Sequence, residues 1–236
     1  AVSFPENNSR LDMLRHDRLH DGAFEFRLKN TTMIGDKFDF ECHYEMIGSG
    51  GETRKALQSF LNQYPSLSGS PLLGGATRDE QRVMDLTREI SSHSDYLVYH
   101  RIDRLVLSAY ADRGSVRIGR QALTWGNGFL FTPMDLFNPF SPMDVERDYK
   151  IGDDMITAQI YTGGAGELQM LYVPRRNTEN DHIEWASSAV AAKYHFNVSR
   201  MDMDVMAGKN YEDTVFGVGF TGYLANAAWR LDSTWT

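Results

Sequence analysis

The feature that most constrains this chain is a strict alternation of apolar and polar residues in runs of about ten residues. Between residues 38 and 46, apolar side chains take the even positions, and Asp39, Glu41, His43 and Glu45 take the odd ones. Successive side chains of a β-strand point to opposite faces of the sheet, so this period of two predicts a strand with one apolar and one charged face. The chain must therefore build a sheet in which both faces find a suitable environment.

Similar runs recur along most of the chain and predict about nine or ten strands, joined mainly by tight turns. They occupy 23–29, 38–46, 94–112, 116–125, 154–162, 167–174, 187–198, 201–205, 216–221 and 225–235. The alternation stops within 48–92, where we expect an extramembrane insertion with a short helix at 53–64 and weak helical character at 77–90. The chain 1–236 is expected to form a single β domain.

Alternation alone leaves two all-β architectures open. In a water-soluble sandwich or barrel the apolar face forms the core, whereas in an outer-membrane barrel it meets lipid and the charged face lines a wet lumen. Strand lengths close to a bilayer span, Tyr and Trp near strand ends, and neighbouring charges of both signs favour the membrane architecture. No run of about eighteen apolar residues is present, which excludes a transmembrane helix. The predicted fold is an antiparallel transmembrane β-barrel with meander topology.

The stretch 126–152 is apolar and yet unable to continue as a strand. Its prolines, Pro133, Pro139 and Pro142, cannot donate hydrogen bonds to a sheet, and its aromatic residues are too frequent for a free surface loop. We therefore expect the stretch to fold back into the lumen. The expected anchors are three phenylalanines, Phe129, Phe131 and Phe137.

Charged residues of this loop and of the two strands before it are the candidate pore-lining residues. The loop carries Asp135, Asp144, Arg147 and Lys150, and the strands carry Arg101, Arg104, Arg117 and Arg120. Facing charges of opposite sign would narrow the lumen and select solutes by charge; alternatively, these charges pair with one another and plug the lumen. Arg117 and Arg120 would face opposite sides of an ideal strand, unless a bulge at Gly119 brings them to the same side.

The run GRQALTWGNGFLFTPMDLFNPFSP, with the DYKIGDDM that follows, resembles a segment of several porin-like outer-membrane families of Gram-negative bacteria. In those families a strand bearing G-R-Q and W-G leads into an N-P loop. The resemblance covers residues 101–160 and implies a barrel and its location, but no particular solute, because the family members are largely uncharacterised. Such barrels generally end on a strand with an aromatic terminal residue, whereas this chain stops at Thr236 within an expected strand. We therefore expect an incomplete barrel, a fragment of a longer chain.

Several other classes of function find little support. The net charge of −8 and the scattered Lys and Arg residues leave no basic footprint, so no nucleic-acid partner is expected. The single cysteine, Cys42, excludes an intramolecular disulfide and any CxxC motif. His16 and His20 have the spacing of a zinc motif, but Asp17 replaces its glutamate and no third ligand is evident, so no metal site is expected.

Enzyme motifs are also missing, since the sequence has no GxSxG elbow, P-loop or GxGxxG fingerprint; we expect neither an enzyme nor a cofactor. Two carboxylate pairs, Asp153–Asp154 and Asp202/Asp204, are interpreted as turn or lumen residues. The expected function is passive diffusion of small solutes or ions through a channel in the Gram-negative outer membrane, with lipid around it and a homo-oligomer or a lumen-occupying partner left open. A soluble β-rich ligand-binding module and a plugged, non-conducting barrel scaffold remain the alternatives.

Overall fold

The computed structural model describes residues 20–64, 79–128, 132–139 and 149–236, and the chain divides into two compact units. The described residues of the first unit fall within 1–27, 45–78 and 87–101, and those of the second within 28–44, 79–86 and 102–236. The second unit contains most of the strands and most of the residues discussed below.

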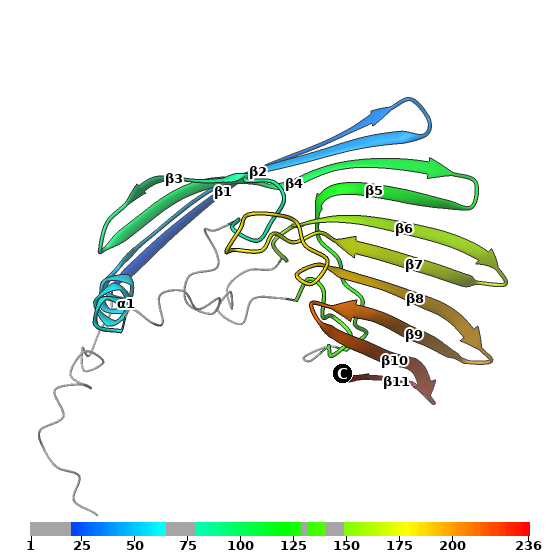
Figure 1. Cartoon of the computed structure of the whole chain (residues 1–236). Coiled ribbons are helices and arrows are strands. Elements are labelled where there is room, and N and C mark those ends of the chain that lie inside the picture. The colour runs from blue at the N-terminus through cyan, green and yellow to red at the C-terminus, as the bar shows by residue number, and fades with distance from the viewer. Residues whose placement is uncertain (1–19, 65–78, 129–131, 140–148) are drawn as a thin grey trace, which may run out of the picture. The chain divides into compact units, whose positions relative to one another are not determined.

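Eleven strands and one helix make up the regular structure of the described residues (Figure 1). The strands are β1 (Asp21–Ile34), β2 (Phe38–Gly51), β3 (Thr87–Ser92), β4 (Tyr96–Ala111), β5 (Gly114–Gln121), β6 (Asp153–Gly163), β7 (Gly166–Val173), β8 (Ala189–Val198), β9 (Met201–Asn210), β10 (Asp213–Leu224) and β11 (Ala227–Trp235), and the helix is α1 (Glu52–Gln63). They form one antiparallel sheet in chain order, with β3 beside β4 and off the main path. The sheet is open, because β1 and β11 are its edges. The predicted all-β antiparallel meander is confirmed.

The interval between β2 and β4 differs partly from prediction. The predicted short helix is confirmed as α1, but weak helical character at 77–90 is wrong for the described part, because residues 79–86 form turns and bends and β3 follows. β3 exists through its ladder with β4, which runs from Thr87 opposite Arg101 to Ser92 opposite Leu97. Strand formation by such a charged sequence depends on its partner more than on its own residues.

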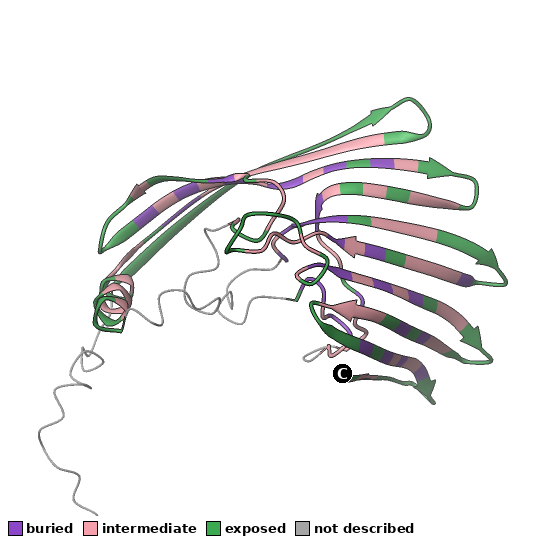
Figure 2. Ribbon diagram, in the orientation of Figure 1, coloured by how far each residue is buried: buried purple, intermediate pink, exposed green. Residues whose placement is uncertain are grey.

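One face of β4–β11, which we call the outer face, carries continuous apolar rows. One row crosses all eight strands and consists of Ala109, Val116, Ala158, Met170, Ala192, Ala207, Phe216 and Trp235. Large side chains on this face are exposed: Ile118 keeps 52% of its surface accessible and Phe216 keeps 55%. Figure 2 shows these exposed positions alternating with buried ones along the strands.

The opposite face, the inner face, is mixed and polar. A representative row consists of Glu167, His195, Asp204, Gly219 and Asp232. Residues 122–128 and 132–138 pack on the apolar part of this face and form the main hydrophobic core with it. That core contains Trp125, Met134, Phe137, Met155, Leu171, Val173, Ala189, Ala191, Met206 and Val215. The core of this unit is therefore built by a folded-back connection rather than by a second sheet.

The first unit has a smaller core of its own, formed by Ile47, Leu97 and Tyr99. Its helix α1 begins where the Asp21 carboxylate accepts a hydrogen bond of 3.0 Å from the backbone N–H of Thr53. Within the described residues, no helix has the length and apolar character needed to cross a membrane.

Candidate functional site

The strongest polar feature of the second unit is a network of six buried or half-buried charges, which we call the Arg120 network. Its members are Asp79, Arg82, Arg120, Asp153, Asp154 and Arg175. Three are acidic and three are basic, so the network is neutral as a whole. It joins the turn segment 79–86, the start of β6 and the connection after β7 to the end of β5.

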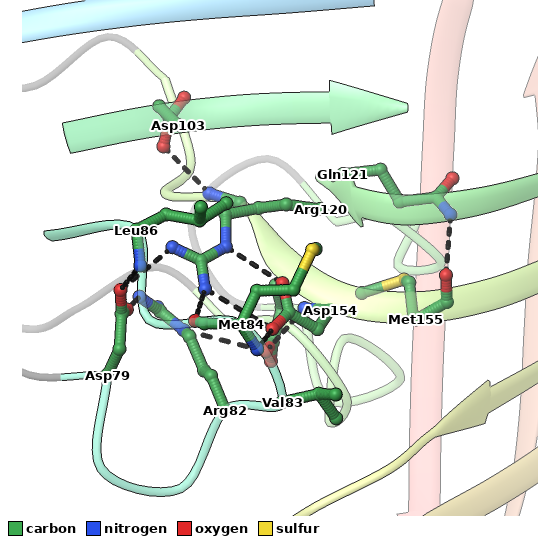
Figure 3. A network of polar contacts seen from close by, with 12 residues as sticks. Asp79, Arg82, Val83, Met84, Leu86, Asp103, Arg120, Gln121, Asp154 and Met155 are labelled. Atoms are coloured by element: carbon green, nitrogen blue, oxygen red, sulfur yellow. Dashed lines mark hydrogen bonds and ion pairs between the residues drawn. The ribbon is translucent and has the colours of Figure 1, made fainter. Parts of the chain in front are cut away.

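Arg120 lies at the centre of this network (Figure 3). Its Nε donates to Oδ1 of Asp154 over 2.8 Å, and its Nη1 donates to Oδ2 of Asp79 over 3.0 Å. Its Nη2 donates to the carbonyl oxygen of Met84. The side chain of Arg120 is only 1% exposed, and these contacts satisfy its guanidinium on three sides.

The two carboxylates also hold the backbone of the turn segment. Asp154 accepts a hydrogen bond of 2.6 Å from the N–H of Met84, and Asp79 accepts one of 2.8 Å from the N–H of Leu86. Burial by itself raises the pKa of Asp79, but the positive charges of Arg120 and Arg82 outweigh that effect and lower it to about 2. Asp79 is therefore ionised at neutral pH.

A second set of contacts extends the network to the connection after β7. Arg82 lies 2.6 Å from Asp79 and 3.6 Å from Asp153, and Nη1 of Arg175 donates to Asp153 over 2.9 Å. Arg176 also donates to the carbonyl oxygen of Val83 over 2.6 Å. Segments 79–86 and 174–188 are thus fastened to the sheet and to each other by charge-assisted hydrogen bonds, which are stronger than neutral ones.

Gly119, directly before Arg120 in β5, has an unusual backbone conformation. In a regular strand Arg120 would share the outer face with Ile118. The pairing of β5 with β4 and with β6 is continuous across Gly119, so the suggested bulge is not present. Instead Gly119 adopts a φ of +125°, and a Cβ there would lie 2.0 Å from the carbonyl oxygen of Leu105. This backbone conformation favours glycine, and the absence of a Cβ lets the two strands approach closely at this point.

The other three wall arginines are placed differently. Arg101, in the first unit, donates from Nε to Glu45 over 2.7 Å. Arg104 pairs with its neighbour Asp103 and donates to the carbonyl oxygen of Lys150 over 2.7 Å. Arg117 has a side chain that is 36% exposed, on the inner face, and contacts Glu41 at 3.2 Å. Each of the four arginines thus has a carboxylate partner of its own within the described residues.

The described loop charges pair with each other. Nζ of Lys150 pairs with the carboxylate of Asp135 and donates to the carbonyl oxygen of Leu123 over 2.8 Å. Burial raises the pKa of Asp135 and lowers that of Lys150, because it disfavours the charged form of each. The pair therefore joins Lys150 to Asp135 and Leu123 in the same connection.

Aromatic anchoring of the loop is partly observed. Phe137 is buried, and its ring meets Trp125 edge to face with centroids 5.5 Å apart. Four other predicted residues lie outside the described ranges: Phe129, Phe131, Asp144 and Arg147. Trp125 and Met134, both buried in the same core, were not expected as anchors.

The segment is also fixed to β9 and β11 by two carboxylates. Asn127 donates from its side chain to Asp204 over 2.6 Å and from its backbone N–H to Asp232 over 2.7 Å. Nδ1 of His195 lies 3.0 Å from Oδ1 of Asp204 and donates a hydrogen bond to it when that nitrogen carries the proton. Gly219 leaves room for this contact, since a Cβ there would lie 2.7 Å from Nδ2 of Asn127.

Sequence reasoning missed most of these partners. Asp153, Asp154 and Asp204 had been noted as turn or lumen residues, and all three are buried in contacts with cations or amides. The sequence did not mark Asp79 and Arg82 as candidate site residues, because their segment has no regular alternation of apolar and polar side chains. Over the ranges that the structure describes, no group of three or more His, Cys, Asp or Glu side chains could hold a metal ion.

Neither the protein-family models nor the curated proteins contain a match to this chain.

Proposed function

We propose that this chain forms part of the wall of an outer-membrane β-barrel, a porin-like channel for passive diffusion of small solutes or ions. The observation that carries the proposal is the distribution of side chains between the two faces of the sheet. Large apolar residues such as Ile118 and Phe216 are exposed, whereas Arg120 and Asp154 are buried. In a water-soluble protein, large apolar side chains of a sheet are normally buried and charged side chains are normally exposed.

The size of the outer face supports a lipid environment. Exposure of one large apolar side chain to water costs about 1.5–3 kcal/mol relative to burial, and the outer rows present such side chains on every strand from β4 to β11. Monomeric soluble proteins rarely expose an apolar patch above about 300–600 Å². Acyl chains would cover this face without further protein.

Strand length and aromatic placement are consistent with the same environment. β8 has 10 residues, β9 has 10 and β11 has 9, which matches the roughly 9–11 residues of a tilted membrane-spanning strand. Exposed aromatic residues gather near the tight-turn ends, among them Tyr161, Tyr194, Tyr223 and Trp229. Tyr and Trp favour the interface between lipid and water.

A second candidate, a barrel scaffold that does not conduct, is favoured by a different observation. The predicted pore charges that the structure describes are paired, and residues 122–128 and 132–138 contribute to the core on the inner face. Charges that pair with one another inside a barrel can block its lumen, so that no solute passes. A partner in the lumen and a homo-oligomer both remain compatible with this candidate.

The test separates these functions. The purified protein is partitioned between membrane and aqueous fractions and then reconstituted from detergent into a planar bilayer. Discrete conductance steps support the channel, and a membrane-bound but silent protein supports the scaffold. A chain that remains soluble and monomeric without detergent contradicts both, and would favour the soluble ligand-binding module.

A further inference from the structure

The inner face of strands β7–β11 carries more acidic than basic side chains. The pairing of these strands places every second residue of each on this face, in rows such as Gln169, Lys193 and Met206. The charged residues at these positions are five carboxylates, Glu167, Asp202, Asp204, Asp213 and Asp232, and two cations, Lys193 and Arg230. With neutral histidine, this part of the inner face therefore has an excess of three negative charges.

One of the five carboxylates, Asp204, lies beside positive groups. Its Oδ1 is 3.7 Å from Nζ of Lys193 and 3.0 Å from Nδ1 of His195. Among the residues that the structure describes, it is the one carboxylate of this set that takes part in an ion pair. The charge of the other four is not cancelled by a neighbouring cation within the described ranges.

Two of these four carboxylates are held by side-chain amides. Glu167 accepts a hydrogen bond from Nε2 of Gln169, two residues further along β7. Asp202 accepts one from Nδ2 of Asn197, its cross-strand partner on β8. Such neutral donors fix the orientation of a carboxylate and favour its charged form, but they leave its negative charge in place.

Asp232 is also held by neutral donors. Its Oδ2 accepts hydrogen bonds of 2.7 Å and 3.1 Å from the backbone N–H groups of Asn127 and Gly128. Its Oδ1 is buried and has no hydrogen-bond partner among the described residues. A buried acceptor without a donor is costly, so this oxygen favours a ligand that brings a donor or a positive charge.

We propose that the channel selects cations, such as potassium ions and small solutes with a single ammonium group, over anions. This inference rests on the proposed channel function and names the solute class that the inner face favours. The contrast with the Arg120 network carries it, since Asp79 and Asp154 each lie beside an arginine there. The inner-face carboxylates have amide donors in place of arginines, so their negative field reaches a passing solute.

The size of the expected preference follows from the potential at such a surface. A cleft lined by charges of one sign concentrates ions of the opposite sign, and its potential reaches several kT. Even a potential of about 1 kT enriches a monovalent cation over a monovalent anion about sevenfold. Rings of acidic side chains select cations in other channels by the same attraction.

Reversal potentials in a planar bilayer with a gradient of KCl test the proposal. We expect the purified protein to pass potassium about sevenfold more readily than chloride. The preference should weaken as the mean KCl concentration rises from about 0.1 M to about 1 M, because the Debye length shortens from about 10 Å to about 3 Å. This measurement needs no variant, and a preference that does not weaken with salt would overturn the proposal.

A double variant assigns the preference to named carboxylates. Glu167→Gln with Asp202→Asn removes two of the excess charges and keeps the shape of both side chains, so the preference should fall from about sevenfold to about twofold. The matched control is Glu179→Gln with Glu212→Gln, which removes the same charge from exposed residues on connections outside the strands. The control should keep the native preference.

The remaining outcomes separate the inference from the function on which it rests. A current that favours chloride, or that favours neither ion, overturns the cation preference and leaves the channel in place. An unchanged preference in the Glu167 and Asp202 variant, or an equal loss in the control, also overturns the inference. A protein that inserts into the bilayer without any current overturns the channel function, and the cation preference with it.

Discussion

Asp79 and Arg120 form a buried ion pair with a distance of 3.0 Å, although 41 residues separate them in the chain. Asp79 begins a turn segment without regular structure, and Arg120 lies near the end of β5. Their contact fastens the turn segment to the sheet. Removing Arg120 leaves Asp79 with Arg82 alone, and removing Asp79 leaves Arg120 with Asp154 alone, so either change weakens the compensation of a buried charge.

Substitution of Arg120 is expected to destabilise the protein strongly. Arg120→Met leaves both Asp79 and Asp154 without their main cation, so we expect a loss of about 3–5 kcal/mol in the free energy of unfolding. The control is Arg117→Met, because Arg117 is partly exposed and makes one ion pair; its loss should stay below about 1 kcal/mol. Denaturant unfolding in detergent micelles measures both, and equal losses would contradict a central role for Arg120.

The network should also make stability depend on acidity. The pKa of Asp79 falls from its ordinary value of 3.8 to about 2 in the folded protein. Its ionised form therefore contributes stability above pH 3.8, and that contribution is lost as the pH falls through about 2. Asp79→Asn should be less stable than the native protein at pH 5, and the difference should shrink between pH 4 and 2 when unfolding is followed by circular dichroism. A difference that does not change with pH would show that the carboxylate is not the source.

The Asp135–Lys150 pair is expected to behave as a coupled unit. Lys150→Met alone strands a buried carboxylate and should cost about 3–5 kcal/mol, whereas the double variant Asp135→Leu with Lys150→Met should cost much less than the sum of its single changes. A double-mutant cycle on unfolding free energies measures the coupling. Additive single costs would mean that the two side chains do not depend on each other.

Space at Gly219 should control the position of the folded-back segment. A Cβ at this residue would lie within 3.1 Å of Asn127, Asp232 and Met134, so Gly219→Val is expected to displace residues 122–128 and 132–138 from the inner face. If the protein conducts, single-channel conductance should rise; in a silent barrel, conductance should appear. Gly22→Val is the control, because nothing lies within 4 Å of its Cβ position. Unchanged currents in the Gly219 variant would argue that the segment does not limit passage.

The outer face offers a test of the lipid environment that needs no current. Ala192 lies in the middle of the outer apolar row, and Gln169 lies on the inner face of the neighbouring strand. Ala192→Arg should reduce stability in lipid by about 2–4 kcal/mol, the cost of arginine on the lipid face near the bilayer midplane, whereas Gln169→Arg should be tolerated better. The ratio of folded to unfolded protein in vesicles at increasing urea gives both values. The reverse order would contradict the assignment of the two faces.

The alternation in the sequence predicted every strand of the sheet except β3, together with the chemical character of the two faces. Side chains of a strand point to opposite sides whatever the strand pairs with, so Phe38 and Asp39 had to separate in any sheet. The prolines likewise predicted the interruption after β5. Phe137 was recognised as an anchor because an apolar residue in an irregular segment needs a surface to cover it.

The partners of the charges depended on the tertiary structure. Arg120 meets Asp79 and Asp154 only because the meander brings β5 beside β6 and folds the turn segment over their ends. The positive φ of Gly119 likewise belongs to the folded chain, and local patterning does not predict it. The sequence by itself determined which positions are apolar and which are charged, since that follows from short-range geometry. The pairing of the buried charges was decided by the tertiary structure. A buried charge is stable only beside a partner of opposite sign, and here the partners come from segments that are distant in the chain.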